Sequence, residues 1–382
     1  MLLANAYVLL GNFVFQKCDV LLSEGKIARI MPCGFLKDAD TLDCGGSYLL
    51  PGLIDVHTHG CDGVDVMDGG YDTINRMSRF MARHGVTSFL PTSMTAAVED
   101  IDFAFRSVKE AYDKGCDGAN VVGINMEGPY INPGKAGAQD PKYVKAASIE
   151  EFCALQQAAG GLIKLVTVAP EMPGNMEFIR EAAALGVHVS CGHSVAGFDQ
   201  IIEAKDNGAD HMTHLYNAMT PLSHRDPNAV GAAFISDELY CEVICDGIHL
   251  HRAAVLTAYR MKGSDRMLFI SDSMMATGLS DGQYKIGSLD VWVRDGIARI
   301  KEGNLAGSTA KLLNCVRKAV EFGIPLEEAV KMGSLTPAKS VGIDHTKGSI
   351  EVGKDADVIV VGQDLALQKT IVGGKVVFSS KV

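Results

Sequence analysis

Eight short apolar runs, separated by segments of helix length, constrain the fold of this chain more than any other feature of the sequence. The runs are 53–57, 87–91, 121–127, 163–169, 187–193, 211–214, 241–246 and 268–272. Helices are expected at 71–84, 99–114, 149–159, 175–185, 197–207, 252–261, 309–322 and 336–341. This alternation predicts parallel βαβ units, and eight strands close a (β/α)8 TIM-like barrel. A doubly wound open sheet is the alternative, but no glycine-rich phosphate loop follows an early strand.

Both ends of the chain differ from this middle part, because short β-rich runs alternate there directly with turn residues. The expected strands are 6–10, 13–15, 19–22, 26–31, 349–351, 357–361, 368–372 and 376–378. Short strands from both termini most simply form one small β-sandwich. We therefore expect a β-sandwich domain from residues 1–50 and 345–382, and a barrel over 51–344 with an inserted hairpin at 284–301.

Composition excludes several classes of function. The chain has 35 Lys and Arg against 46 Asp and Glu, a net charge of −11, whereas a nucleic-acid binder needs a basic face. No run reaches the roughly 18 to 20 apolar residues that cross a bilayer, and the N-terminus lacks the basic leader of a signal peptide. Ten cysteines without an export signal predict reduced thiols and a cytoplasmic protein.

Metal-ligand and acid–base side chains stand where the predicted barrel strands end, which is where barrel enzymes carry their active sites. His57 and His59 are two residues apart, so a strand points both imidazoles to the same face, where they could chelate a divalent metal. The other candidates at strand ends are Glu127, His193, His214 and Asp272. A single histidine is more often a structural core residue, but four of them at the ends of three strands favour a shared site.

Two other histidines have structural interpretations. His84 precedes Gly85 at a predicted helix end, where a favourable interaction with the helix dipole explains it. His211 has the opposite strand parity to His214 and is expected to face the helices. Asp272 closes the eighth run, and an aspartate there can act as a general base and then as a general acid.

Together these residues resemble the amidohydrolase superfamily and, within it, the N-acetylglucosamine-6-phosphate deacetylase family. The motifs that carry the resemblance are PGLIDVHTHG at 51–60, EGP at 127–129, GHS at 192–194, HLYNAM at 214–219, DGIH at 246–249 and LAGS at 305–308. The fourth run ends without the bridging lysine of many superfamily members, and Glu127 looks like the bridging ligand instead.

The resemblance implies metal-dependent hydrolysis of N-acetyl-D-glucosamine 6-phosphate to D-glucosamine 6-phosphate and acetate, with a metal-activated water as nucleophile. It implies a main metal site of Glu127, His193 and His214, a second site of His57, His59 and Glu127, and Asp272 as the catalytic acid–base. Implied substrate contacts are Ala138, Gln139, Asn217, Ala218, Arg225, His249, Leu305, Ala306 and Gly307. The cofactor would be one or two divalent ions per subunit, zinc first, with iron, manganese or cobalt also suited to these ligands.

The phosphate of such a substrate must be attracted by a chain with a net charge of −11. Arg225 is the best candidate partner, because a guanidinium matches phosphate oxygens bidentately. In the family that the chain resembles, this arginine reaches in from a neighbouring subunit, so a homodimer is expected.

Two other classes of function stay open at this stage. One is another amidohydrolase, of D-aminoacylase, dihydroorotase or deaminase type, against which the absent lysine on the fourth strand and the HLYNAM run both argue. The other is a non-catalytic barrel that serves as a scaffold, although every expected catalytic position is filled. Metal analysis together with an assay of acetate release would separate these possibilities.

Overall fold

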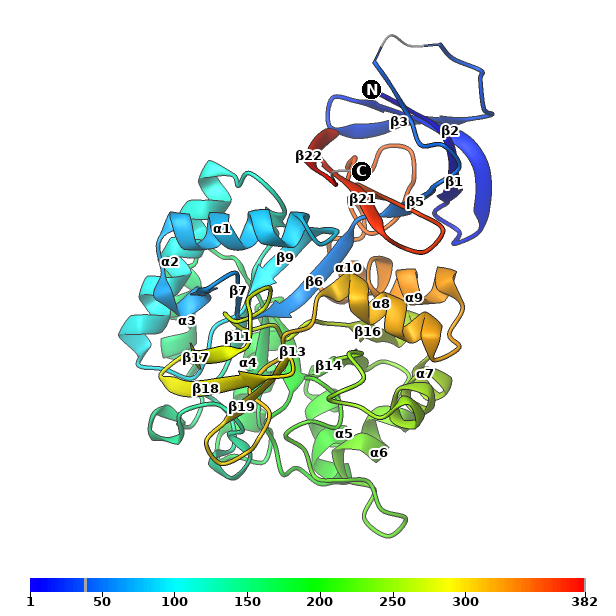
Figure 1. Cartoon of the computed structure of the whole chain (residues 1–382). Helices are drawn as coiled ribbons and strands as arrows, with labels where there is room; N and C mark the ends of the chain where they lie inside the picture. The colour runs from blue at the N-terminus through cyan, green and yellow to red at the C-terminus, as the bar shows by residue number, and fades with distance from the viewer. Residues whose placement is uncertain (38–39, 381–382) are drawn as a thin grey trace.

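The computed structural model describes residues 1–37 and 40–380, and Figure 1 shows parallel strands enclosed by helices beside a separate group of terminal strands. Two parallel sheets form the central part. Their strands are β6 (Leu53–Thr58), β9 (Val86–Pro91) and β10 (Asn120–Val121) in one, and β11 (Ile124–Glu127), β12 (Ile163–Val168), β13 (His188–Cys191), β14 (His211–Met212), β15 (Tyr240–Val243) and β16 (Met267–Phe269) in the other. Every predicted apolar run thus contains a strand, and the third run is interrupted between β10 and β11.

Isolated parallel bridges join the edges of the two sheets. Thr92, just after β9, pairs with Asn125 of β11, and Thr58 of β6 pairs with Ser273 beyond β16. The backbone N–H of Asp272 also donates to the carbonyl of His57 at 2.9 Å. The ends of β6 and β16, which are more than two hundred residues apart in sequence, are therefore held side by side.

Helices follow most of the parallel strands, and all eight predicted helices are confirmed. Their bounds are α1 (Tyr71–Ala82), α2 (Val98–Lys114), α3 (Ile149–Ala158), α4 (Asn175–Ala184), α5 (Phe198–Asp206), α7 (Arg252–Arg266), α8 (Leu312–Glu321) and α10 (Leu335–Ser340). Two further helices, α6 (Asn228–Ile235) and α9 (Leu326–Met332), were not predicted. The α6 sequence NAVGAAFI lacks the polar stripe by which an amphipathic helix is recognised.

Helix α2 illustrates why these segments pack against the sheets. Its buried positions include Ile101, Ala104, Phe105, Val108 and Ala111, which recur every three or four residues on one face. Phe105 is completely buried, and burying a side chain of this size stabilises the fold by roughly 1.5–3 kcal/mol.

Strands from both ends of the chain form one eight-stranded sheet of order β22-β21-β20-β5-β1-β2-β3, with β4 on the side of β1. The bounds are β1 (Leu2–Leu9), β2 (Phe15–Ser23), β3 (Lys26–Met31), β4 (Thr41–Asp43), β5 (Tyr48–Pro51), β20 (Val358–Val361), β21 (Leu367–Val372) and β22 (Lys375–Ser379). Its core includes Leu3, Val8, Leu49 and Ile371. The predicted strand at 349–351 is wrong, because only Ile350 makes a single bridge there, to Leu10.

The inserted segment is larger than the predicted hairpin. It contains β17 (Gly282–Ile286), β18 (Leu289–Arg294) and β19 (Ile297–Ile300), so the expected turn at Asp295 and Gly296 joins the second and third strands. Its apolar face packs on Met94 and Met274, near the ends of the parallel strands. Among the described residues, no helix is long and apolar enough to cross a membrane.

Candidate active site

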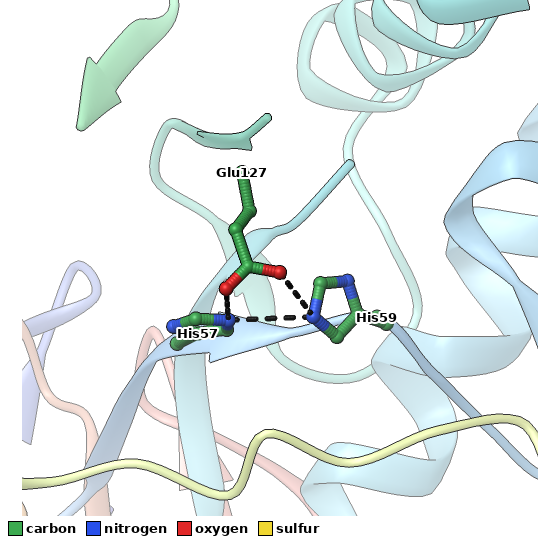
Figure 2. A group of neighbouring side chains, drawn as sticks. All are labelled: His57, His59 and Glu127. Carbon is green, nitrogen blue, oxygen red and sulfur yellow. Dashed lines mark hydrogen bonds and ion pairs between the residues drawn. The ribbon is translucent and has the colours of Figure 1, made fainter. Parts of the chain in front are cut away.

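Two groups of potential metal ligands share one carboxylate, Glu127 at the end of β11. The first group is His57, His59 and Glu127, and the second is Glu127, His193 and His214. Figure 2 shows the two oxygens of Glu127 directed at the two imidazoles of the first group. The predicted ligands, which come from strands β6, β11, β13 and β14 or from the residues that follow them, are therefore brought together at one centre.

The separations within both groups fit a metal ion. In the first group, Nε2 of His57 lies 3.4 Å from Oε1 of Glu127 and 3.3 Å from Nε2 of His59. In the second group, Nε2 of His214 lies 3.2 Å from Oε1 of Glu127 and 3.1 Å from Nε2 of His193. Bonds of about 2.0 to 2.1 Å to a tetrahedral Zn²⁺ separate neighbouring donor atoms by about 3.3 Å.

Hydrogen bonds on the far side of three imidazoles turn their Nε2 lone pairs inward. Nδ1 of His59 lies 3.2 Å from the carbonyl of Thr92, and Nδ1 of His193 lies 2.8 Å from the carbonyl of Lys135. A carbonyl only accepts, so each Nδ1 carries the hydrogen and each Nε2 is an acceptor when the ring is neutral. Acceptor atoms that face one another at such distances repel unless a cation lies between them.

Nδ1 of His57 lies 3.0 Å from Oε2 of Glu242, a buried carboxylate on β15. Sequence reasoning missed Glu242. A charged residue inside the apolar run 241–246 was a signal that could have identified it, because a carboxylate is not buried without a partner.

The buried carboxylates make the electrostatic potential at this centre favourable for positive charge. Burial by itself lowers the pKa of His57, but the charges of Glu127 and Glu242 outweigh burial and raise that pKa to about 9. Burial raises the pKa of Glu127, yet His193 and His57 bring it well below the usual value, so Glu127 stays ionised. Both shifts favour a cation among these side chains.

Asp272 lies beside the first group of ligands, because the end of β16 is held next to the end of β6. Its Oδ1 lies 3.2 Å from Nε2 of His59 and 3.7 Å from Nε2 of His57. Although burial raises its pKa, the contact with His59 contributes most to a net lowering, so the carboxylate is ionised at neutral pH.

The backbone turns sharply at three of these positions. His193, His214 and Asp272 have φ values of 48°, 28° and 49°, a region that non-glycine residues seldom occupy. Each follows a strand, so the left-handed conformation redirects the chain as it leaves the sheet. Such residues cost of order 1–3 kcal/mol each and cluster at functional sites.

A cavity of about 410 Å³ opens onto the two ligand groups, a volume suited to a small molecule. The predicted substrate contacts that line it are Ala138, Gln139, Asn217, Ala218, His249, Leu305 and Gly307. Ala306 is fully buried and does not line the cavity, and Arg225 lies on an exposed loop outside it. Lys135, which was not predicted, also lines the cavity.

Two lining residues are fixed by neighbours. Nε2 of Gln139 donates to Oε2 of Glu127 at 2.6 Å, while Oε1 of Gln139 accepts the N–H of Thr95 at 2.8 Å. Nδ1 of His249 pairs with Asp246 at 2.7 Å.

A third cluster, at the opposite ends of the strands, differs from these groups in its distances. Asp210 lies 2.6 Å from Nδ1 of His188 and 2.7 Å from Nδ1 of His211. These are hydrogen-bond lengths, shorter than the separations of donors around a metal. His211 is buried and stacks on Tyr240, so this cluster holds neighbouring strands together.

Comparison with known proteins agrees with this geometry. Residues 48–377 match the Amidohydrolase family. The N-acetylglucosamine-6-phosphate deacetylase of Vibrio furnissii is 40% identical over 98% of this chain and 94% of its own length. The enzyme of the same name from Bacillus subtilis (strain 168) is 41% identical over 88% and 86%. An N-acetylgalactosamine-6-phosphate deacetylase of Escherichia coli O157:H7 is 36% identical over 93% of each chain.

Solved structures give the same result. N-acetylglucosamine-6-phosphate deacetylase from Pasteurella multocida superposes with a TM-score of 0.94 at 31% identity, covering 99% of both chains. An aspartate-to-alanine mutant of the Mycobacterium smegmatis enzyme, in complex with N-acetyl-D-glucosamine-6-phosphate, gives 0.93 at 30% identity, again over 99% of both chains.

The α/β fold and the paired histidine–carboxylate groups define a metal-dependent hydrolase, and the chain belongs to the amidohydrolase family. Within that family its relatives of 40 and 41% identity are N-acetylglucosamine-6-phosphate deacetylases.

Proposed function

We propose that this protein hydrolyses N-acetyl-D-glucosamine 6-phosphate to D-glucosamine 6-phosphate and acetate. The observation that carries the proposal is the convergence of His57, His59, His193 and His214 on Glu127, beside a cavity that all of these residues except His57 line. Relatives named N-acetylglucosamine-6-phosphate deacetylase match the chain over nearly its whole length, which supports the choice of substrate.

We propose that Glu127, His193 and His214 hold the main metal ion, and that His57 and His59 with Glu127 hold a second. A metal bound there supplies Lewis acidity and lowers the pKa of water to about 7. Nitrogen and oxygen ligands at these separations suit zinc, and iron, manganese or cobalt are also compatible with them.

In this proposal Asp272 moves the proton. Its ionised carboxylate accepts a proton from the water that attacks the acetyl carbonyl, and the C–O bond forms. The protonated carboxyl then donates to the amide nitrogen as the C–N bond breaks, releasing the amine of the sugar. The position of Asp272 beside His59 and at the wall of the cavity supports this role.

Substrate contacts are proposed for Ala138, Gln139, Asn217, Ala218, His249 and the stretch Leu305, Ala306 and Gly307. We further propose a homodimer in which Arg225 of one subunit meets the phosphate bound in the other. An exposed position outside the cavity of its own chain is compatible with that role.

For the architecture, we propose that the parallel strands form a closed (β/α)8 barrel over residues 51–344. The bridges from Thr92 to Asn125 and from Thr58 to Ser273 support closure. The terminal sheet would be the β-sandwich domain of residues 1–50 and 345–382. A cytoplasmic location is proposed as well, supported by ten cysteines that are all free thiols.

The decisive experiment measures acetate released from N-acetylglucosamine 6-phosphate by purified protein, before and after chelation and after Zn²⁺ is restored. The unphosphorylated sugar and N-acetylgalactosamine 6-phosphate are the controls, because one relative acts on the galacto epimer according to its name. We expect release from the phosphorylated gluco sugar that stops on chelation and returns with metal. Faster release from the galacto epimer would contradict the proposed substrate, and release that is insensitive to chelation would contradict the mechanism.

A further inference from the structure

Glu242 is a buried carboxylate that the proposed reaction does not use. It lies on β15 between Cys241 and Val243, and its side chain is completely inaccessible to solvent. Among the described residues its ion-pair partner is His57, at 3.0 Å. Burying a carboxylate is costly unless partners compensate, so its contacts indicate what the residue does.

One oxygen of Glu242 makes both side-chain contacts. Oε2 accepts from Nδ1 of His57 at 3.0 Å and from the backbone N–H of His214 at 3.1 Å. The carbonyl of Glu242 accepts the N–H of Leu215 at 2.8 Å. Its other oxygen, Oε1, is buried and has no hydrogen-bond partner in the described part of the chain. Glu242 therefore joins an imidazole of the first ligand group to the backbone that carries a ligand of the second.

We propose that Glu242 is a positioning residue that holds His57 as an Nε2 metal ligand and so sets the metal affinity of the His57–His59–Glu127 group. The inference rests on the proposed metal-dependent function. With Nδ1–H donated to Glu242, the Nε2 lone pair faces Glu127 and His59. Without that acceptor the ring can turn, or place its hydrogen on Nε2, where it would exclude the ion.

The effect is specific to one group. Nδ1 of His193 is held by the carbonyl of Lys135 and Nδ1 of His59 by that of Thr92, and neither contact involves Glu242. The N–H of His214 that meets Glu242 belongs to the backbone, whereas its Nε2 faces Glu127. Loss of the Glu242 contacts therefore frees an imidazole of the first group, whereas the second group loses only a backbone contact of His214, so the first group should weaken more.

Two conservative variants distinguish the effect of side-chain length at position 242 from the effect of its negative charge. Glu242→Gln loses the charge but can place its amide oxygen at the Oε2 position, where it accepts both hydrogen bonds. Glu242→Asp keeps the charge but is one methylene shorter, and it loses contact with His57 and with the backbone N–H of His214. If the hydrogen bond fixes His57, the aspartate variant should bind metal more weakly, and the glutamine variant is its matched control.

The test is a titration of metal-free wild type, Glu242→Gln and Glu242→Asp with Zn²⁺ against a chromophoric chelator, with elemental analysis of bound zinc. Removal of such a supporting contact lowers metal affinity roughly 10- to 100-fold. We expect that loss for one of two ions in Glu242→Asp, and near-normal binding of both in Glu242→Gln. Thermal unfolding of the metal-free proteins checks that each variant folds.

Wild-type affinity for both ions in Glu242→Asp would overturn the inference, as would equal weakening of both ions. A loss in Glu242→Gln as large as that in Glu242→Asp would also overturn it, because charge rather than the hydrogen bond would then be responsible. Metal affinity is measured without substrate, so failure of acetate release would count against the proposed function and leave this result unaffected.

Discussion

Replacing Asp272 by asparagine separates proton transfer from the other properties of this site. Asparagine has the same shape as aspartate and tolerates a positive φ, which is 49° at this position. The hydrogen bonds that hold the residue come from its backbone: its N–H donates to His57 at 2.9 Å, and its carbonyl accepts from Ser308 at 2.7 Å. The variant should therefore fold and keep this geometry.

The size of the effect follows from what the carboxylate contributes. An amide can neither accept the proton of the attacking water nor return it to the leaving amine. General acid–base catalysis is worth roughly a hundredfold to ten-thousandfold, so turnover should fall at least about a hundredfold, or about 2.7 kcal/mol in the barrier. Metal content should not change, because both ligand groups are complete without Asp272.

The assay compares kcat for acetate release and bound metal in wild type and Asp272→Asn. A near-normal kcat would refute the acid–base role. A fall in activity that is accompanied by loss of metal would refute the reasoning in another way, since Asp272 would then act as a ligand.

Three further predictions concern other parts of the molecule. Arg225→Ala should raise KM for the phosphorylated sugar in steady-state kinetics, and mixing it with Asp272→Asn subunits should restore activity if Arg225 acts across a dimer; an unchanged KM rejects the role. Glu127→Ala should lose both metal ions while His59→Ala keeps one, as measured by elemental analysis; retention of an ion by Glu127→Ala would contradict the shared carboxylate. Burial, with Lys311 and Arg83 nearby, lowers the pKa of His84 to about 4. The unfolded chain, with a pKa near 6.5, therefore binds that proton more tightly, and stability falls as pH drops from about 6.5 to 4. Urea unfolding of metal-free His84→Gln should show up to about 3 kcal/mol less acid destabilisation than wild type, and parallel pH curves would disprove this.

Residues at strand ends were predictable because they depend on local patterns. His57 and His59 share a face through the two-residue period of a strand, and Glu127 ends an apolar run. The helix-dipole interaction that was expected to explain His84 requires a cationic imidazole, and tertiary packing opposes that charge. Its ring packs on Phe80 with centroids 4.4 Å apart, and burial keeps it neutral. The benefit expected from the helix dipole is smaller than this loss of hydration.

The contacts that orient the ligands could not be predicted from the sequence. The acceptors for His59 and His193 are backbone carbonyls of Thr92 and Lys135, which every residue type possesses. Glu242 is separated from His57 by 185 residues, so only the tertiary arrangement of β6 and β15 brings them together. Helix α6 (Asn228–Ile235) was missed because it is apolar on all sides, and periodicity cannot identify such a helix.

These observations have a joint consequence for the stability of the site. Three ligand or catalytic positions, His193, His214 and Asp272, have strained backbones, and the ionised carboxylates of Glu127 and Asp272 repel each other. The backbone N–H groups of His214 and Asp272 donate to Glu242 and His57 of other strands, and the carbonyl of His193 accepts the N–H of Asn132. The strands thus hold like charges close together, and positive charge at the site offsets their repulsion. Binding a cation relieves that repulsion without rearrangement, so metal should stabilise the whole fold, by about 2.7 kcal/mol at a concentration of a hundred times Kd.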